Sequence, residues 1–76
     1  MSYVISTLID EQVYCVYPDP EANKFKLIHI QFDSDLSKAY CSNLTGALEI
    51  LKWIKKNDKD LASHEFSVQL EARYLR

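Results

Sequence analysis

The stretch SNLTGALEILKWIKKND, residues 42–58, decides the fold because the hydrophobic period changes there from two to about 3.6 residues. Its apolar residues fall at helical spacing. They are Leu44, Ala47, Leu48, Leu51 and Ile54. Ser42 or Asn43 is a suitable N-cap, and the charged run after Ile54 predicts a helix end near residues 58–60. The sequence therefore predicts one amphipathic helix with the stripe above as its buried face.

The residues before this helix favour strands. Residues 3–9 and 13–17 are rich in β-branched and aromatic residues and predict a hairpin around a short turn. Both prolines lie within residues 18–23, which predicts a loop, and residues 24–32 predict a third strand.

The third predicted strand has a break in its alternation. Phe25 and Leu27 share one parity, whereas Ile28, Ile30 and Phe32 share the other. Either a bulge resets the phase or both faces of this strand are covered. We expect a bulge near Leu27 and Ile28.

Two further strands are expected. Residues 33–37 predict a turn and residues 38–42 a short fourth strand. Residues 66–74 alternate clearly, with Phe66, Val68, Leu70, Ala72 and Tyr74 on the side expected to face the helix. The order βββ(β)αβ predicts a single α+β domain in two layers, an antiparallel sheet of four or five strands with one helix packed on one face.

Composition limits the class of protein. The chain has 76 residues, 47% of them hydrophobic and 26% charged, as expected for one small globular domain. No apolar run is long enough to span a bilayer, and the first residues do not resemble a signal peptide, so we expect a cytoplasmic protein without a membrane partner.

Residues with catalytic or ligand-binding chemistry are few. Cys15 and Cys41 lie in strand-like segments and are expected to be buried thiols, and His29 and His64 have no partner at ligand spacing. A pair of Cys15 with His29 across neighbouring strands is a minor alternative. The single glycine, Gly46, excludes a glycine-rich phosphate loop. We expect no enzyme activity, no metal and no cofactor.

Charge is unevenly distributed along the chain. The net charge is −2, and four acids precede the first lysine. They are Asp10, Glu11, Asp19 and Glu21. We expect these acids to contribute to a contact surface for a basic partner.

Trp53 is the strongest candidate for a binding residue. At about 100° per residue it lies roughly 140° from the centre of the predicted buried stripe. It is therefore either an exposed anchor for a partner, together with Glu49 and Lys56, or it folds down over neighbouring side chains or under the loop at residues 18–23. A second copy of the chain is a further candidate partner.

Four lysines suggest an alternative. They are Lys52, Lys55, Lys56 and Lys59, at a spacing that a helix could present to phosphates. Nucleic acid is the less favoured partner, because a solvated helix face explains the same pattern.

The favoured function is a small non-enzymatic domain that binds and inhibits a larger protein or nucleoprotein. In size, absence of catalytic motifs and patchy acidity the chain resembles small phage-encoded inhibitors of host defence such as anti-CRISPR proteins. The resemblance lies in these general features and in no sequence motif, so it assigns no functional residues.

Overall fold

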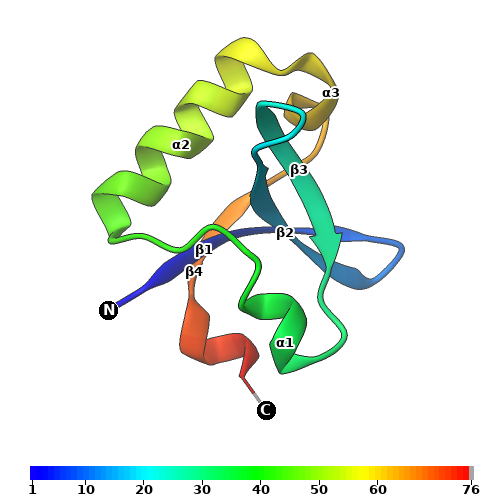
Figure 1. Cartoon of the computed structure of the whole chain (residues 1–76), viewed down its shortest axis with the longest axis vertical. Coiled ribbons are helices and arrows are strands. Elements are labelled where there is room, and N and C mark those ends of the chain that lie inside the picture. Colours follow the sequence, from blue (N-terminus) through cyan, green and yellow to red (C-terminus); the bar gives the residue numbers. More distant parts are fainter. Residues whose placement is uncertain (76) are drawn as a thin grey trace.

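The computed structural model describes residues 1–75 and shows an α+β fold (Figure 1). The strands are β1 (Tyr3–Ile9), β2 (Gln12–Asp19), β3 (Lys24–His29) and β4 (Ser67–Leu70). The helices are α1 (Asp33–Leu36), α2 (Leu44–Asn57), α3 (Lys59–Ala62) and the 3-10 helix η1 (Glu71–Tyr74).

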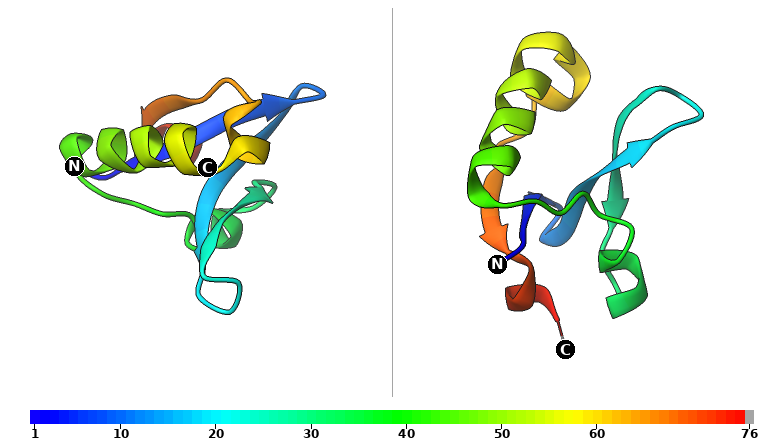
Figure 2. Two further views of the ribbon diagram at one scale, coloured as in Figure 1. Left: turned by 90° about the horizontal axis from the view of Figure 1, so that it is seen from above. Right: turned by 60° about the vertical axis from the view of Figure 1, so that its left-hand side comes forward.

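The four strands form one antiparallel sheet in the order β3-β2-β1-β4. Helix α2 packs along one face of this sheet, which confirms the predicted class and the two-layer arrangement (Figures 1 and 2). Asn43 is the N-cap of α2, since its side chain accepts a hydrogen bond from the Gly46 N–H at 2.7 Å.

The predicted β1–β2 hairpin is confirmed. Its two-residue turn places Asp10 and Glu11 at φ values of 53° and 66°, the left-handed conformation that such tight turns require. Strand β2 extends to Asp19 and so includes Pro18, which shortens the predicted loop. Pro18 is tolerated because the pairing of β2 with β1 stops at Cys15, so its missing N–H faces no ladder partner.

Strand β3 has no bulge, because its pairing with β2 is continuous from Lys24 to His29. The predicted bulge is therefore wrong, and the other explanation holds. Leu27 packs against the core below α2, whereas Ile28 and Ile30 pack against a second cluster on the opposite face. Covering both faces removes the need for a phase change.

The second face of the sheet is covered in part by α1. Leu36 is 1% exposed and packs with Ala39, Val4 and Cys15. The predicted turn at residues 33–37 is thus a one-turn helix, which anchors an apolar side chain on the face away from α2. The fold has two small cores, one on each side of the sheet.

The expected strand at residues 38–42 does not form a ladder. The Tyr40 N–H donates to the Val16 carbonyl of β2 at 2.8 Å, and Ser42 exchanges two backbone hydrogen bonds with Tyr3 of β1. Ala39 belongs to the cluster under α1, and Ala47 to the core under α2. The linker therefore carries the chain from one face of the sheet to the other and bonds to two different strands on the way.

The buried stripe of α2 differs from the predicted one. Ala47, Leu51 and Ile54 are buried as expected, but Leu44 and Leu48 are 45% and 49% exposed. Ile50 packs against the core in their place. The helix is thus rotated so that the flank carrying Trp53 moves closer to the sheet.

The last predicted strand is only partly confirmed. Phe66 and Val68 pack against the core below α2, but β4 ends at Leu70, which is 38% exposed. Residues 71–74 form η1, so Ala72 is exposed and Tyr74 turns to the opposite face of the sheet. Apolar and polar residues continue to alternate through residues 71–74, so the sequence pattern did not show that the strand ends at Leu70 and a 3-10 helix follows.

Candidate functional site

Trp53 lies on the flank of α2 that faces β3. Its ring is 6.0 Å from that of Phe25 in an edge-to-face arrangement, and Phe25 makes a similar contact with Tyr40 at 5.9 Å. The residue is nevertheless 47% exposed. Trp53 therefore combines the two predicted alternatives, because one side of the ring packs on Phe25 and the other faces solvent.

A shallow hollow of about 410 Å³ opens beside this tryptophan. Its lining comes from the β2–β3 loop, the start of β3 and α2, namely Pro18, Asp19, Pro20, Asn23, Lys24, Phe25 and Trp53. Two proline rings and two aromatic rings make its walls largely apolar. This composition suits an apolar side chain of a partner.

Asp19 fixes the loop that forms the rim of the hollow. One carboxylate oxygen accepts hydrogen bonds from the backbone N–H groups of Glu21 and Ala22, and the other lies 2.7 Å from Lys26 Nζ. The hydrogen bond from Lys26 is the main reason that the pKa of Asp19 lies below its usual range. The predicted contact residue Asp19 thus holds the loop in shape, and its charge is already paired.

The other predicted acids fall into two groups. Glu21 is exposed in the same loop as Asp19, whereas Asp10 and Glu11 are exposed in the β1–β2 turn. Successive turns of an antiparallel sheet lie at opposite ends, and the eight residues of β2 separate them by about 25 Å at the usual rise. The four acids therefore do not form one surface.

The polar neighbours of Trp53 on α2 are placed as predicted. Glu49 lies four residues before it and Lys56 three residues after it, and both are exposed. Lys52 and Lys55 are exposed on the same helix. Lys59 belongs to α3, so the four lysines do not lie on a single helix as the sequence suggested.

Asp58 explains why the helix changes direction before Lys59. Its backbone leaves the helical conformation, and its side chain accepts a hydrogen bond from the Leu61 N–H at 3.1 Å as the N-cap of α3. Asp58 was visible in the sequence as a residue suited to an N-cap, but we interpreted it only as the end of the helical region.

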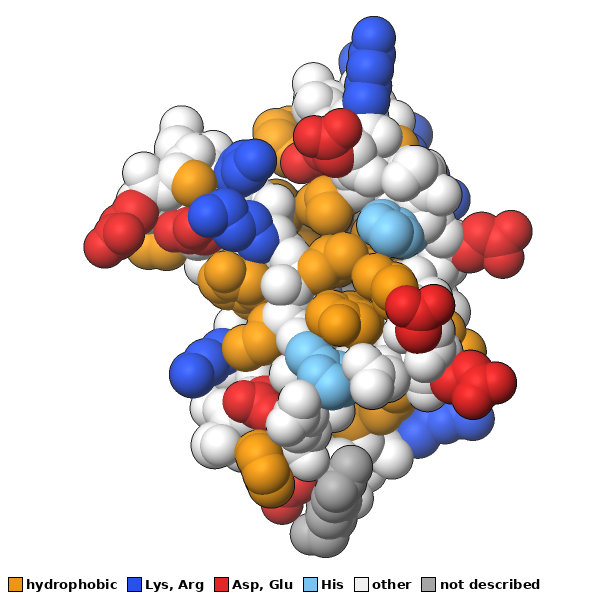
Figure 3. Space-filling model, turned by 90° about the vertical axis from the view of Figure 1, so that its right-hand side faces the viewer, with side chains coloured by type: hydrophobic (Ala, Val, Ile, Leu, Met, Phe, Trp, Pro, Cys, Tyr) orange, Lys and Arg blue, Asp and Glu red, His pale blue; other side chains and the backbone are white. Residues whose placement is uncertain are grey.

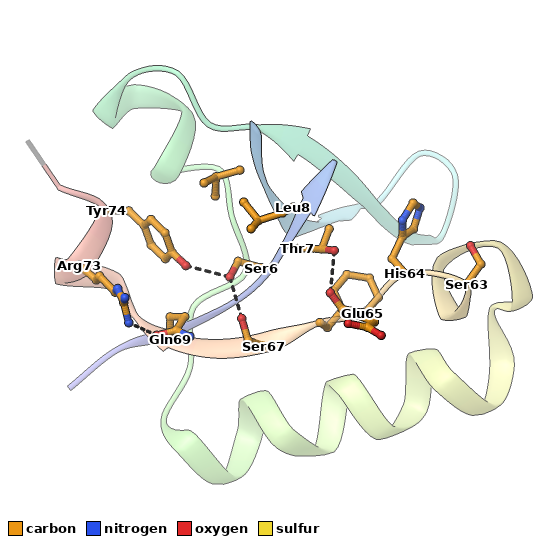
Figure 4. Close-up of a pocket in the computed structure, with 12 residues that line it drawn as sticks. Ser6, Thr7, Leu8, Ser63, His64, Glu65, Ser67, Gln69, Arg73 and Tyr74 are labelled. Carbon is orange, nitrogen blue, oxygen red and sulfur yellow. Dashed lines mark hydrogen bonds between the residues drawn. The ribbon is translucent and has the colours of Figure 1, made fainter. Parts of the chain in front are cut away.

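A second hollow, of about 680 Å³, lies where β4 separates from the end of β1 (Figure 4). Ser6 is almost completely buried there, and its hydroxyl lies 2.9 Å from Tyr74 Oη and 3.4 Å from Ser67 Oγ. Thr7 donates to the Glu65 carbonyl at 2.7 Å. These buried hydroxyls tie η1 and the segment before β4 to β1, which gives them a structural role.

Sequence reasoning missed Ser6 and Thr7. The only signal was a polar pair inside the apolar run of β1, and such residues normally point to solvent in an edge strand. Their burial follows from the position of β1 in the middle of the sheet.

Both histidines lie beside an apolar surface, seen in Figure 3 with hydrophobic side chains between them. The His29 ring stacks on Tyr14 at 4.9 Å, and the His64 ring meets Phe66 edge-on at 6.3 Å. His29 also lies within 2.7 Å of Gln31 Nε2. Both histidines are half-buried, His29 in a strand and His64 in a loop, as expected.

The two cysteines differ. Cys15 is buried, and burial raises its pKa to about 11. Cys41 is exposed, so its predicted burial is wrong, but its thiol donates to Glu71 Oε2 at 2.7 Å. Partial burial of the sulfur and this hydrogen bond raise the pKa of Cys41 to about 12. Within residues 1–75, Cys15 pairs across the sheet with Ile28, not with His29.

The fold and the Trp53 hollow define the chain as a small two-layer α+β domain with an aromatic surface site. Among the described residues, no group of three or more potential ligands could hold a metal ion, and no helix is long and apolar enough to cross a membrane. No protein-family model, curated protein or solved structure matches the chain.

Proposed function

We propose that this chain is a non-enzymatic interaction domain that binds and inhibits a larger protein or nucleoprotein through the hollow beside Trp53. The observation that carries the proposal is the half-exposed tryptophan, whose ring meets Phe25 and borders an apolar hollow with two prolines. Tryptophan is among the residues that contribute most to binding at protein interfaces.

The rigidity of the rim supports the same function. The Asp19 carboxylate fixes the loop before any partner binds, and Phe25 limits the movement of the Trp53 ring. A surface that is already ordered loses less conformational entropy on binding. Asp19 and Lys24 line the hollow, and Glu21, Glu49 and Lys56 are exposed on the same loop and helix, so charges of both signs accompany the apolar walls, as is typical of protein interfaces.

The kind of partner follows from size, acidity and the absence of a catalytic motif, which favour a counter-defence inhibitor of the anti-CRISPR type acting in the cytoplasm. Asp10 and Glu11 extend from the far end of the β1–β2 hairpin and offer a second, acidic contact for a basic surface of the partner. A partner that touches both sites would have to span the length of β2.

Nucleic-acid binding is the alternative. Lys52, Lys55 and Lys56 are exposed on the helix that carries Trp53, so phosphate contacts and one stacking ring lie on the same element. Such binding would weaken steeply as salt is raised, whereas contact through an apolar hollow would not.

The test is a comparison of two helix variants in pull-downs from cells of the organism that carries the gene. Trp53→Ala should lose the captured partner, and Leu48→Ala, which changes a similarly exposed apolar residue on the other flank, should retain it. Retention of the partner by folded Trp53→Ala would overturn the proposal. Capture of nucleic acid alone, lost on raising salt, would favour the alternative.

A further inference from the structure

The hollow where β4 separates from β1, which we call the β1–β4 hollow, is distinct from the one beside Trp53. Ser6 and Leu8 share the parity of Val4 along β1, and Val4 packs in the cluster under α1, on the face of the sheet away from α2. Among the described residues, none lines both hollows. The volume of about 680 Å³ is in the usual range for small-molecule sites. A ligand bound here would leave the Trp53 site free, so the two sites can be tested separately.

Three hydroxyl groups that line the β1–β4 hollow contain more donors than they use. Ser6 Oγ lies 2.9 Å from Tyr74 Oη and 3.4 Å from Ser67 Oγ, and within residues 1–75 these hydroxyls make no other hydrogen bond. Each hydroxyl carries one O–H, so the two contacts use at most two of the three O–H groups. At least one O–H is therefore free to donate to an acceptor atom in the hollow.

The position of Ser6 departs from the pattern of a stable core. Strand β1 lies inside the sheet, and Ser6 is almost completely buried on the face that also buries Val4. A buried hydroxyl must find a hydrogen-bond partner, whereas an apolar side chain at the same place would need none. The partner, Tyr74 Oη, comes from η1, where the strand pattern is broken. Departures from consistent core patterning are expected at functional sites.

Charged groups of opposite sign line two parts of this hollow. Arg73 donates one guanidinium N–H to Gln69 Oε1 at 2.9 Å, and its other N–H groups have no partner within residues 1–75. The Glu65 carboxylate, four residues before Gln69, forms no ion pair in the described part of the chain. Four extended residues span at most about 14 Å. Figure 4 shows Arg73 beside Gln69, with Ser67 between Gln69 and Glu65.

Apolar side chains line the same hollow. Leu8 is 69% exposed, more than any other leucine of the chain, although it lies on a sheet face and not in a loop. Val13 pairs with Leu8 from the neighbouring strand, and the Tyr74 ring contributes a further apolar surface. An apolar group bound here would remove the Leu8 side chain from water, which is favourable.

We propose that the β1–β4 hollow binds a short free peptide of about three residues, with its ammonium group at Glu65 and its carboxylate at Arg73. Three extended residues are about 10 Å long, and the flexible Glu65 and Arg73 side chains close the remaining distance. A peptide carbonyl between the two ends accepts the free O–H of the hydroxyl groups, and an apolar side chain of the peptide covers Leu8.

The charges select this ligand over simpler ones. An anion without an amine gains from Arg73 but is repelled by Glu65, and an amine without a carboxylate meets the reverse. Arginine is also suited to carboxylates because its planar N–H groups can contact both oxygen atoms. A segment inside a longer chain carries neither terminal charge, so the hollow favours a free peptide over a loop of a partner protein.

The test is a titration of the intact, ¹⁵N-labelled chain with trileucine, followed by NMR. Amide shifts should centre on Ser6, Leu8 and Ser67, with a dissociation constant of about 1 mM or lower. Two blocked peptides separate the terminal charges. N-acetyl-trileucine lacks the ammonium group and trileucine amide lacks the carboxylate, and each should bind at least about fivefold more weakly than trileucine.

Variants of the chain assign each terminal charge to its partner. Arg73→Gln should weaken trileucine at least about fivefold but leave binding of trileucine amide unchanged, and Glu65→Gln should weaken trileucine but leave N-acetyl-trileucine unchanged. Lys56→Gln and Glu49→Gln remove exposed charges on α2 and are the matched controls, which should bind like the parent. Circular dichroism verifies that each variant is folded.

Three results would overturn the proposal. The first is the absence of shifts at Ser6, Leu8 and Ser67 with about 10 mM trileucine, a concentration that would nearly saturate a site of 1 mM affinity. The second is equal binding of trileucine and both blocked peptides by the parent. The third is a folded Arg73→Gln or Glu65→Gln that binds trileucine as tightly as the α2 controls do.

Discussion

Replacing Trp53 with alanine should destabilise the fold by an intermediate amount. Trp53 is 47% exposed, so about half of its surface is covered, mainly on the side of Phe25. Truncating a fully buried tryptophan costs about 3 to 5 kcal/mol, so half of that is about 2 kcal/mol. Alanine recovers about 0.5 kcal/mol through its higher helix propensity. The expected loss in the free energy of unfolding is therefore about 1.5 kcal/mol.

The loss can be measured by urea unfolding followed by circular dichroism, since the variant no longer contains the single tryptophan needed for fluorescence. For a chain of this size, 1.5 kcal/mol corresponds to a decrease in Tm of about 6 to 12 °C. A double-mutant cycle with Phe25→Leu should show a coupling of about 0.5 kcal/mol or more, as expected for an aromatic pair.

Two outcomes would refute this reasoning. An unchanged free energy of unfolding would mean that Phe25 does not hold the Trp53 ring, and a loss above about 3 kcal/mol would mean that the ring is fully buried. Leu48→Ala provides the control on the same helix. Because Leu48 is 49% exposed on the flank away from β3, its truncation should cost clearly less than that of Trp53.

Three further changes test other parts of the structure. Glu11→Gly should raise the free energy of unfolding by about 1 kcal/mol in urea unfolding, because glycine adopts a φ of 66° without the strain of a side chain. The hydrogen bond from Lys26 lowers the pKa of Asp19 in the folded protein, so the charged carboxylate stabilises the fold at pH values above the unfolded-state pKa. This stabilisation is lost as the pH falls through the folded-state pKa. Asp19→Asn should therefore lower Tm at pH 7 and not at pH 2. The Cys41 thiol, with a pKa near 12, should react slowly with iodoacetamide at pH 8, and Glu71→Gln should speed the reaction in mass-spectrometric time courses.

Local patterns in the sequence determined much of the fold. The change of period at residues 42–58 predicted α2 with Ser42 or Asn43 as its cap, of which the structure uses Asn43, and β-branched residues predicted the β1–β2 hairpin. These features could be predicted because each depends on neighbours within a few residues along the chain. The α+β class then followed, since one amphipathic helix needs the apolar face of a sheet.

The tertiary structure alone decided which faces were buried. Ile28 and Ile30 seemed out of phase until α1 and Tyr74 were found to cover the second face of the sheet. Likewise, Leu44 and Leu48 have the spacing of core residues, but in the packed helix they remain 45% and 49% exposed. Periodicity states which residues share a face and not what lies against it.

The candidate site shows the same division. The sequence singled out Trp53 from its angle on the helix, but the angle was measured from a stripe that the packed helix does not use. Only the tertiary structure brought Phe25 and the Pro18–Pro20 segment against it and paired Asp19 with Lys26. The contacts of Trp53 join segments about 30 residues apart, and their formation depends on how the sheet and helix pack, which no local pattern encodes.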